Sequence, residues 1–208
     1  MQGHATIKDS DLKSQLEDAI SQAPNDYGSL VKLGALLFEP YHDPERAMEI
    51  LQKAVNTAPD REDAWFWIAK CHFHYFFEPR EALLAIENAL KVNPNRADCL
   101  SLKASVLMEL KAPYGEVLKC LDKCLTICPD WVTPRKEKVV VLSKMKRFEE
   151  AQEEIRIVSS LPPFSFLPKD SVEEYYEESV TGRSRPNLKE ELLSLQVRVE
   201  GERLQRRS

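Results

Sequence analysis

Residues 59–94 read PDREDAWFWIAKCHFHYFFEPREALLAIENALKVNP, and the proline that opens this stretch returns at fixed intervals along the chain. Pro24, Pro59, Pro94 and Pro129 stand 35 residues apart, and Pro163 follows after 34. A fixed period of this length is typical of a protein built from stacked structural repeats. The sequence therefore predicts one helical unit repeated several times, and it directs the functional question towards binding rather than catalysis.

Each repeat is expected to hold two helices. A short polar residue that caps helices well follows each of the four prolines, so the first helix is expected to start at Asn25, Asp60, Asn95 or Asp130. In the quoted stretch, Glu78-Pro79 restarts the chain with a proline at a favoured first helical position. The apolar residues of each helix then form one stripe, and in residues 60–94 that stripe comprises Trp65, Ile68, Ala69, Ala82, Ile86, Ala89 and Leu90.

Small residues recur at equivalent places in the predicted helices. Gly34, Ala69 and Ala104 stand 35 residues apart in the first helix, and Ala54 and Ala89 do so in the second. Helices that pack about 8–10 Å apart need small side chains where their backbones approach. These positions therefore predict the contact points between neighbouring helices.

The pattern resembles the tetratricopeptide repeat, whose helix-turn-helix consensus contains W-x2-L-G-x2-Y and has a period of 34 residues. The resemblance covers residues 9–163 and is carried by equivalent positions of the four repeats: Leu30, Trp65, Leu100 and Arg135 at the Trp position, Leu33, Ile68, Lys103 and Lys138 at the Leu position, and Gly34, Ala69, Ala104 and Val139 at the small position. It implies an all-α fold, a right-handed α-solenoid closed by a C-terminal helical cap. The alternative is an irregular all-helical bundle.

The expected domain organisation follows from this alignment. Residues 1–24 are a leading segment with a half-repeat helix, and residues 164–208 are a linker followed by C-terminal helices. Between them we expect four repeats, at residues 25–59, 60–94, 95–129 and 130–163.

The segment after the repeats changes character. Residues 171–178 are expected to form a short acidic helix and residues 181–186 a flexible link. A last helix then carries a narrow apolar seam. That helix either caps the last repeat or meets a partner or a second copy of the chain, which would make a homo-oligomer through Leu188, Leu192, Leu195 and Val199.

Composition limits the classes of function. The chain has 208 residues and a formal net charge of -5, which argues against general nucleic-acid binding because that needs phosphate neutralisation. No apolar run is long enough to cross a membrane, and the start does not resemble a signal peptide. An odd number of cysteines without a disulfide framework indicates a reducing, cytoplasmic setting.

The residues that could support chemistry have structural explanations. Cys120, Cys124 and Cys128 share one helix face, but one straight helix cannot wrap a tetrahedral metal ion, and no CxxC pair is present. His72 and His74 are two apart on a helix and point in different directions. We expect no metal, no cofactor, no catalytic residues and no enzymatic activity.

The resemblance implies that the first helix of each repeat lines a concave groove in which a partner lies. Contiguous exposed aromatic surface marks interaction sites, and the first half of this groove is apolar and aromatic. The alternative is that Phe66 and Phe73 pack under neighbouring helices or under the chain's own tail. The predicted partner-binding residues are Val31, Ala35, Phe38, Phe66, Lys70, Phe73, Met108 and Lys136.

Two further features bear on the partner. Chaperone-binding members of the family carry Lys and Asn at fixed positions that bind a terminal carboxylate. In this chain those positions hold Val31, Ala35, Trp67, Asp98 and Leu102, so binding to heat-shock chaperone tails is disfavoured. A basic cluster in the fourth repeat is either a solvated surface or a site for an acidic segment: Arg135, Lys136, Lys138, Lys144, Lys146 and Arg147.

The sequence thus predicts a non-catalytic protein–protein interaction module, an adaptor that binds a partner peptide or helix in an apolar groove. Two alternatives stay open. One is a secretion-type chaperone or toxin-neutralising protein with one cognate partner, and the other is a self-associating scaffold subunit.

Overall fold

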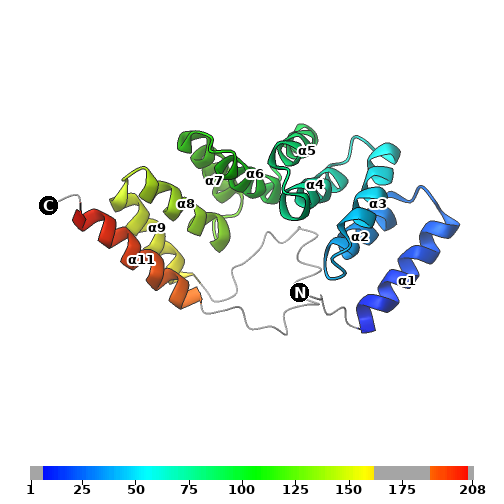
Figure 1. Ribbon diagram of the computed structural model, residues 1–208, viewed down its shortest axis with the longest axis horizontal. Helices are drawn as coiled ribbons and strands as arrows, with labels where there is room; N and C mark the ends of the chain where they lie inside the picture. Colours follow the sequence, from blue (N-terminus) through cyan, green and yellow to red (C-terminus); the bar gives the residue numbers. More distant parts are fainter. Residues whose placement is uncertain (1–6, 162–187, 206–208) are drawn as a thin grey trace. The chain divides into compact units, whose positions relative to one another are not determined.

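The computed structural model describes residues 7–161 and 188–205, and the elements assigned in these ranges are all helices (Figure 1). The chain divides into two compact units, residues 1–94 and 95–208. The acidic helix expected at 171–178 and the link expected at 181–186 lie outside the described residues.

Unit 1 is built from helices packed in consecutive pairs. Helix α2 packs against α3, and α4 packs against α5. Helix α1 also packs on α2, and α3 packs on α4. The π-helix η1 continues α4 without a break. The elements of this unit are α1 (Ile7–Gln22), α2 (Tyr27–Phe38), α3 (Pro44–Thr57), α4 (Glu62–Cys71), η1 (His72–Phe76) and α5 (Pro79–Val92).

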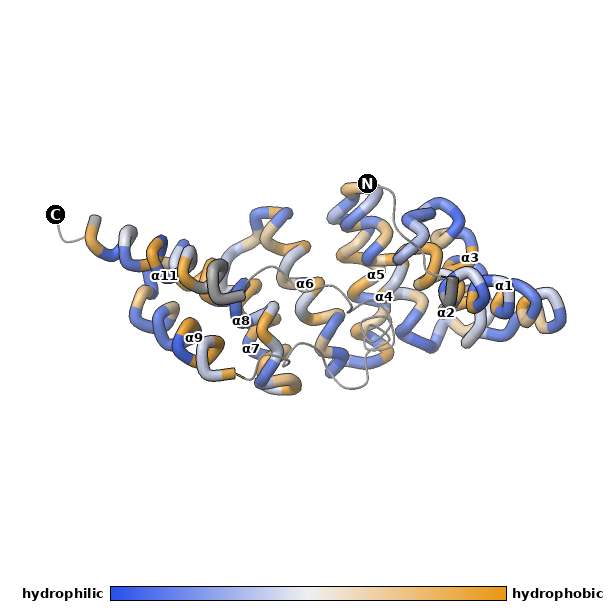
Figure 2. The backbone as a smooth tube through the Cα atoms, turned by 90° about the horizontal axis from the view of Figure 1, so that it is seen from below, coloured by the Kyte–Doolittle hydropathy of each residue, from blue (hydrophilic) through white to orange (hydrophobic). Residues whose placement is uncertain are grey.

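Unit 2 repeats the arrangement. Helix α6 packs against α7, α8 packs against α9, and α11 lies on α9 and α8. Its elements are α6 (Ala97–Glu109), α7 (Tyr114–Ile127), α8 (Val132–Lys144), α9 (Phe148–Ser160) and α11 (Leu188–Gln205). The predicted all-α architecture of stacked helix pairs is confirmed. Figure 2 shows hydrophobic and hydrophilic residues alternating along the helices, as expected of helices that bury one side.

The proline positions form β-turns rather than helix caps. The N–H of Asp26 donates to the carbonyl of Ala23 at 3.0 Å, so Pro24 takes the second turn position, where its fixed φ is favourable, and Asn25 the third. The helices therefore begin one residue later than the sequence predicted. The predicted caps Asn25, Asp60, Asn95 and Asp130 are wrong by one position, and the N-cap residues are Asp26, Arg61, Arg96 and Trp131.

The turn between the two helices of each repeat contains one residue in the left-handed backbone region. The four residues are His42, Phe77, Lys111 and Lys146, with φ of 53°, 56°, 56° and 60°. In the third repeat the next N–H, of Ala112, donates five positions back to Leu107 at 2.9 Å, which is the Schellman geometry. In the second repeat the N–H of Glu78 reaches six positions back, to His72 at 2.9 Å. This repeat is one residue longer than the 34-residue consensus, and the wider π-helical turn of η1 accommodates the additional residue.

The small residues that the sequence predicted at the contacts between helices are buried. Ala69 and Ala104 are completely buried, as are Ala54, Ala89 and Cys124 at the equivalent positions of the second helices. A Cβ added at Gly34 would lie 2.5 Å from Cγ of Leu51, so α2 and α3 approach too closely there for any side chain. Cys124 is therefore a small core residue, as predicted.

Candidate partner-binding surface

Helix α2 lies inside unit 1, and three predicted partner-binding residues lie in the core with it. Val31, Ala35 and Phe38 are 5%, 0% and 1% exposed. The helix is apolar all round and carries a single charged residue, Lys32, so it is stable only when α1, α3 and α4 surround it. The expectation that these three side chains form an exposed groove surface is wrong.

Phe66 is also buried, at 2% exposure, so the alternative that it packs under neighbouring helices is correct. Its ring belongs to an aromatic cluster with Phe38 and Trp67. The ammonium of Lys70, which is half-buried, lies 5.0 Å from the Phe38 ring centroid, 5.7 Å from that of Phe66 and 4.5 Å from that of Trp67. Cation–π attraction of this kind stabilises a lysine at the edge of an aromatic core. The structure thus brings Phe38, Phe66 and Lys70 together, but as an interior cluster.

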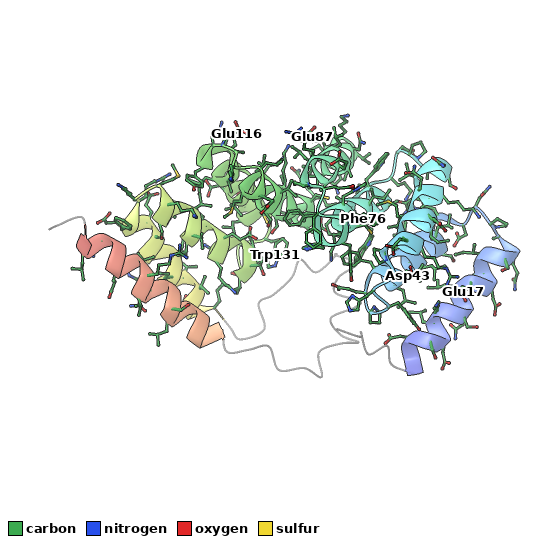
Figure 3. All side chains as sticks on the ribbon, in the orientation of Figure 1. Glu17, Asp43, Phe76, Glu87, Glu116 and Trp131 are labelled. Atoms are coloured by element: carbon green, nitrogen blue, oxygen red, sulfur yellow. The ribbon has the colours of Figure 1, made fainter. Side chains whose placement is uncertain are left out.

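The accessible aromatic surface lies at the end of α4. Residues 72–77 are six consecutive aromatic side chains, HFHYFF, and we refer to them as the aromatic turn. Phe73 and Phe76 are half-buried, His74 is exposed and Phe77 is 80% exposed; Figure 3 labels Phe76. Sequence reasoning selected only Phe73 here and missed His74, Phe76 and Phe77. The run of six aromatic residues was the signal that could have found them.

Specific contacts fix the aromatic turn on unit 1. The hydroxyl of Tyr75 donates to the carbonyl of Phe38 at 3.1 Å and is hydrogen-bonded to Nδ1 of His42. Nδ1 of His72 lies 2.8 Å from a carboxylate oxygen of Glu78. Burial raises the pKa of the Tyr75 hydroxyl, and the nearby carboxylate of Glu39 adds to the shift. The turn is therefore held to α2 and to the start of α5 by its polar atoms, while several of its rings reach the surface.

The two remaining predicted residues lie in unit 2, on α6 and α8. Met108 and Lys136 are both half-buried. Beside Lys136, Oε1 of Glu137 accepts a hydrogen bond from the hydroxyl of Ser105 at 2.8 Å. The other carboxylate oxygen is buried without a hydrogen-bond partner, and burial raises the pKa of Glu137. This part of unit 2 is polar, in contrast to the aromatic surface of unit 1.

The basic cluster of the fourth repeat is largely paired within unit 2. Arg135 donates to Glu154 at 2.6 Å, and the Lys138 ammonium contacts Asp122 at 2.7 Å and Glu154 at 2.8 Å. Arg147 pairs with Glu150 at 2.6 Å. The contacts of Arg135 and Lys138 join α8 to α7 and α9, whereas the Arg147–Glu150 pair is exposed at the start of α9.

The arrangement of helix pairs matches solved repeat proteins. YrrB, described as a TPR protein with an unusual peptide-binding site, aligns with a TM-score of 0.63 and 17% identity over 91% of this chain and 94% of its own. The chain has the tetratricopeptide-repeat fold. TTC0263, a thermophilic TPR protein of Thermus thermophilus, aligns with a TM-score of 0.60 and 17% identity over 92% of this chain and 89% of its own. MamA aligns with a TM-score of 0.63 and 18% identity over 74% and 94%.

At these identities the similarity establishes the tetratricopeptide-repeat fold and leaves the function to the residues of this chain. No protein-family model and no curated protein matches the sequence.

Only one of the four residues predicted to join two copies through the last helix has a described side chain. Val199 is 1% exposed, because α11 packs on α8 and α9, so it is not available to a second copy. The side chains of Leu188, Leu192 and Leu195 lie outside the described ones. The exposed apolar residues of α11 are instead Leu193, Val197 and Leu204, at 61%, 64% and 66% exposure.

The described residues contain no group of three or more His, Cys, Asp and Glu side chains arranged to hold a metal ion. Burial raises the pKa of the Cys71 thiol to about 12 and also raises that of Cys120, which keeps both thiols protonated and weakly reactive. Among the described helices, none is both long and apolar enough to cross a membrane.

Proposed function

We propose that the chain is a non-catalytic protein-binding module and that a segment of a partner protein packs on the aromatic turn of unit 1. The observation that carries this proposal is the run of six aromatic residues at 72–77, which keeps several rings accessible at the end of a core helix. Aromatic side chains combine large contact area with few rotatable bonds, and they dominate the energetics of protein interfaces.

The surroundings of the turn support this role. The buried rings of Phe38, Phe66 and Trp67 form a rigid base, and the hydrogen bonds of Tyr75 and His72 fix the turn before any partner arrives. A preordered surface loses less entropy on binding than a mobile one. YrrB, which shares the fold, is described as having a peptide-binding site, and this is consistent with a peptide or helix as the partner here.

Lys70 and Phe73 are the predicted residues that best serve this surface, because both are partly accessible on α4 and η1. We propose that Phe73 contributes apolar contact area and that the ammonium of Lys70 adds a polar contact at its edge. Met108 and Lys136 belong to unit 2, and the proposal does not depend on them. Phe66→Glu is unsuitable as a test, because a charge at this buried position would disrupt the core.

The test compares Phe73→Ala with Leu84→Ala in affinity purification from the native cell, followed by binding measurements with the purified partner. Leu84 is 63% exposed on α5 of the same unit and serves as the matched control. We expect Phe73→Ala to weaken partner binding about tenfold or more while the protein stays folded, and Leu84→Ala to leave binding unchanged. Equal affinity of both variants and wild type would overturn the proposal.

A self-associating scaffold is the second candidate, and the outer face of α11 favours it. Leu193, Val197 and Leu204 fall at i, i+4 and i+11 and form one exposed apolar stripe. If this stripe joins two copies, light scattering will show a dimer for wild type and a monomer for Leu193→Glu with Val197→Glu. A monomer for the wild-type protein at all concentrations would remove this candidate.

A further inference from the structure

The left-handed residue in the turn between the two helices of each repeat shows one exception to a regular pattern. His42, Phe77, Lys111 and Lys146 all adopt the left-handed backbone region. Glycine and asparagine tolerate this region best, and bulky side chains are disfavoured in it. His42, Lys111 and Lys146 are exposed polar residues, as expected of such a turn. Phe77 is the exception, because it is a bulky aromatic residue there.

Phe77 also receives no compensation from burial. Its side chain is 80% exposed, the highest value among the large hydrophobic residues that the structure describes as exposed. A buried aromatic ring stabilises a fold by leaving water, but this ring remains in water while its backbone adopts a disfavoured conformation. The folded monomer therefore gains nothing from phenylalanine at this position that asparagine would not supply better.

The turn fixes the backbone from which the Phe77 ring projects. The N–H of Glu78 donates to the carbonyl of His72 at 2.9 Å and closes the turn around Phe77. The neighbouring ring of Phe76 packs against His72 with centroids 5.9 Å apart. An exposed aromatic side chain on a fixed backbone turn has a defined point of attachment and few rotatable bonds, which suits insertion into a concavity.

Exposed carboxylates lie close to this anchor along the chain and in the same turn. Glu78 and Glu81 are exposed beside it along the chain, and the exposed Glu39 acts on the pKa of Tyr75 within the same turn. Arg80 is an exposed cation in this stretch. The three exposed carboxylates outnumber the exposed Arg80 and the half-buried Lys70, and this favours a partner surface that carries positive charge.

We propose that Phe77 inserts into an apolar pocket of a folded partner protein whose rim carries Lys or Arg side chains. The inference rests on the proposed function, because it names the kind of partner that the aromatic turn binds. It also differs from a groove that receives a peptide, since this chain supplies the projecting side chain and the partner supplies the pocket.

The first test separates folding from binding. Phe77→Asn replaces the ring by a residue that favours the left-handed region, and Phe77→Leu keeps an apolar side chain. We expect the full-length Phe77→Asn protein to have a melting temperature equal to or above that of wild type. A drop of more than about 5 °C would show a structural role for the ring and overturn the inference.

The second test uses p-benzoylphenylalanine introduced at position 77, and at position 84 as the control, for photo-crosslinking in the native cell. We expect a discrete protein adduct from position 77 that position 84 does not give. The adducted protein, purified, should bind Phe77→Asn at least about tenfold more weakly than wild type, with Phe77→Leu intermediate, and binding should weaken as salt increases. No adduct at 77, the same adducts at both positions, or binding of Phe77→Asn within twofold of wild type would overturn the inference.

The variants also distinguish this inference from the proposed function. If Phe73→Ala loses binding and Phe77→Asn does not, the anchor is rejected and the aromatic surface stands. If neither variant loses binding to the purified partner, the proposed function itself is rejected.

Discussion

The two units share one repeat framework but use their first helices differently. In unit 1, α2 and α4 enclose an aromatic cluster of Phe38, Phe66 and Trp67, with the Lys70 ammonium over the rings. In unit 2, α8 instead carries Arg135 and Lys138, which both contact the buried Glu154 on α9. Aromatic packing therefore joins α2 and α4 in unit 1, whereas in unit 2 ion pairs add to an apolar core and join α8 to α7 and α9.

The small residues at the helix contacts explain how one repeat framework accommodates both aromatic packing and ion pairs. Ala69 in unit 1 and Ala104 in unit 2 are completely buried at equivalent places, so the helices approach in the same way. The residues around these positions are less constrained, because different side chains can fill the space between helices that already pack closely. This difference between the units gives three predictions.

The largest effect is expected at Glu154, because two cations share its carboxylate. The side chain of Glu154 is 11% exposed, and those of Arg135 and Lys138 are 12% and 20% exposed. Glu154→Ala would remove the carboxylate that pairs with Arg135 and would leave Lys138 with Asp122 alone, and this should lower the free energy of unfolding by about 3 kcal/mol. Thermal unfolding should show a drop of about 6–12 °C.

The neighbouring Glu153 provides the control for this prediction. Its ion pair with Arg156 lies at the surface, so Glu153→Ala should change stability by less than about 0.5 kcal/mol. Hydrogen exchange should show that Glu154→Ala lowers protection within residues 95–161. Equal effects of the two substitutions would mean that the ion pairs of Glu154 do not stabilise the packing of α8 on α9.

A smaller effect is expected at Gly34, which tests the packing of unit 1. Gly34→Ala places a Cβ 2.5 Å from Cγ of Leu51, so the Leu51 side chain and α3 have to move. Overpacking of this kind outweighs the gain in helix propensity, and we expect a net loss of about 1–2 kcal/mol in the free energy of unfolding. Hydrogen exchange should locate the loss within residues 7–94.

Gly115 is the matched glycine in unit 2, near the start of α7. A Cβ there meets no atom within 4 Å, so Gly115→Ala should leave stability unchanged or raise it by up to about 1 kcal/mol. If Gly34→Ala is as stable as Gly115→Ala, close packing of α2 on α3 is not what holds unit 1 together.

The sequence predicted most of the framework, because the framework depends on local and periodic signals. The prolines marked the turns between repeats, the apolar stripes marked the helices, and Ala69 and Ala104 marked the close contacts. The predicted caps were displaced by one residue, because Pro-Asn and Pro-Asp prefer the centre of a β-turn to the start of a helix. That preference is local and was available in the sequence.

The accessible surface could not be predicted in the same way. Helix α2 is apolar all round, so its sequence does not show which side chains stay exposed, and Phe38 is buried because three other helices surround α2 in the folded unit. The pairing of Arg135 and Lys138 with Glu154 likewise joins residues on different helices. Exposure and ion pairing depend on tertiary packing, which one sequence does not specify without the fold.

The smallest effect is expected at Glu137, where pH is the variable. Burial raises the pKa of this carboxyl in the folded protein above its unfolded value of 4.5. The folded state therefore binds the proton more tightly, and the stability that this provides is lost as pH rises through the folded pKa. Glu137→Gln carries no charge at this position at any pH. Its free energy of unfolding relative to that of wild type should therefore rise by about 1 kcal/mol between pH 4.5 and pH 8, and the difference in melting temperature measures this change.

Glu150 supplies the control of opposite sign. Its pair with Arg147 lowers the pKa of the Glu150 carboxyl, so the stability that it provides is present above the unfolded pKa and lost in acid. Glu150→Gln should therefore lose stability relative to wild type as pH rises, whereas Glu137→Gln gains it. The same pH trend for both variants would show that burial does not raise the pKa of the Glu137 carboxyl. The contrast between a polar unit 2 and an aromatic unit 1 would then depend on the ion pairs of Glu154 alone.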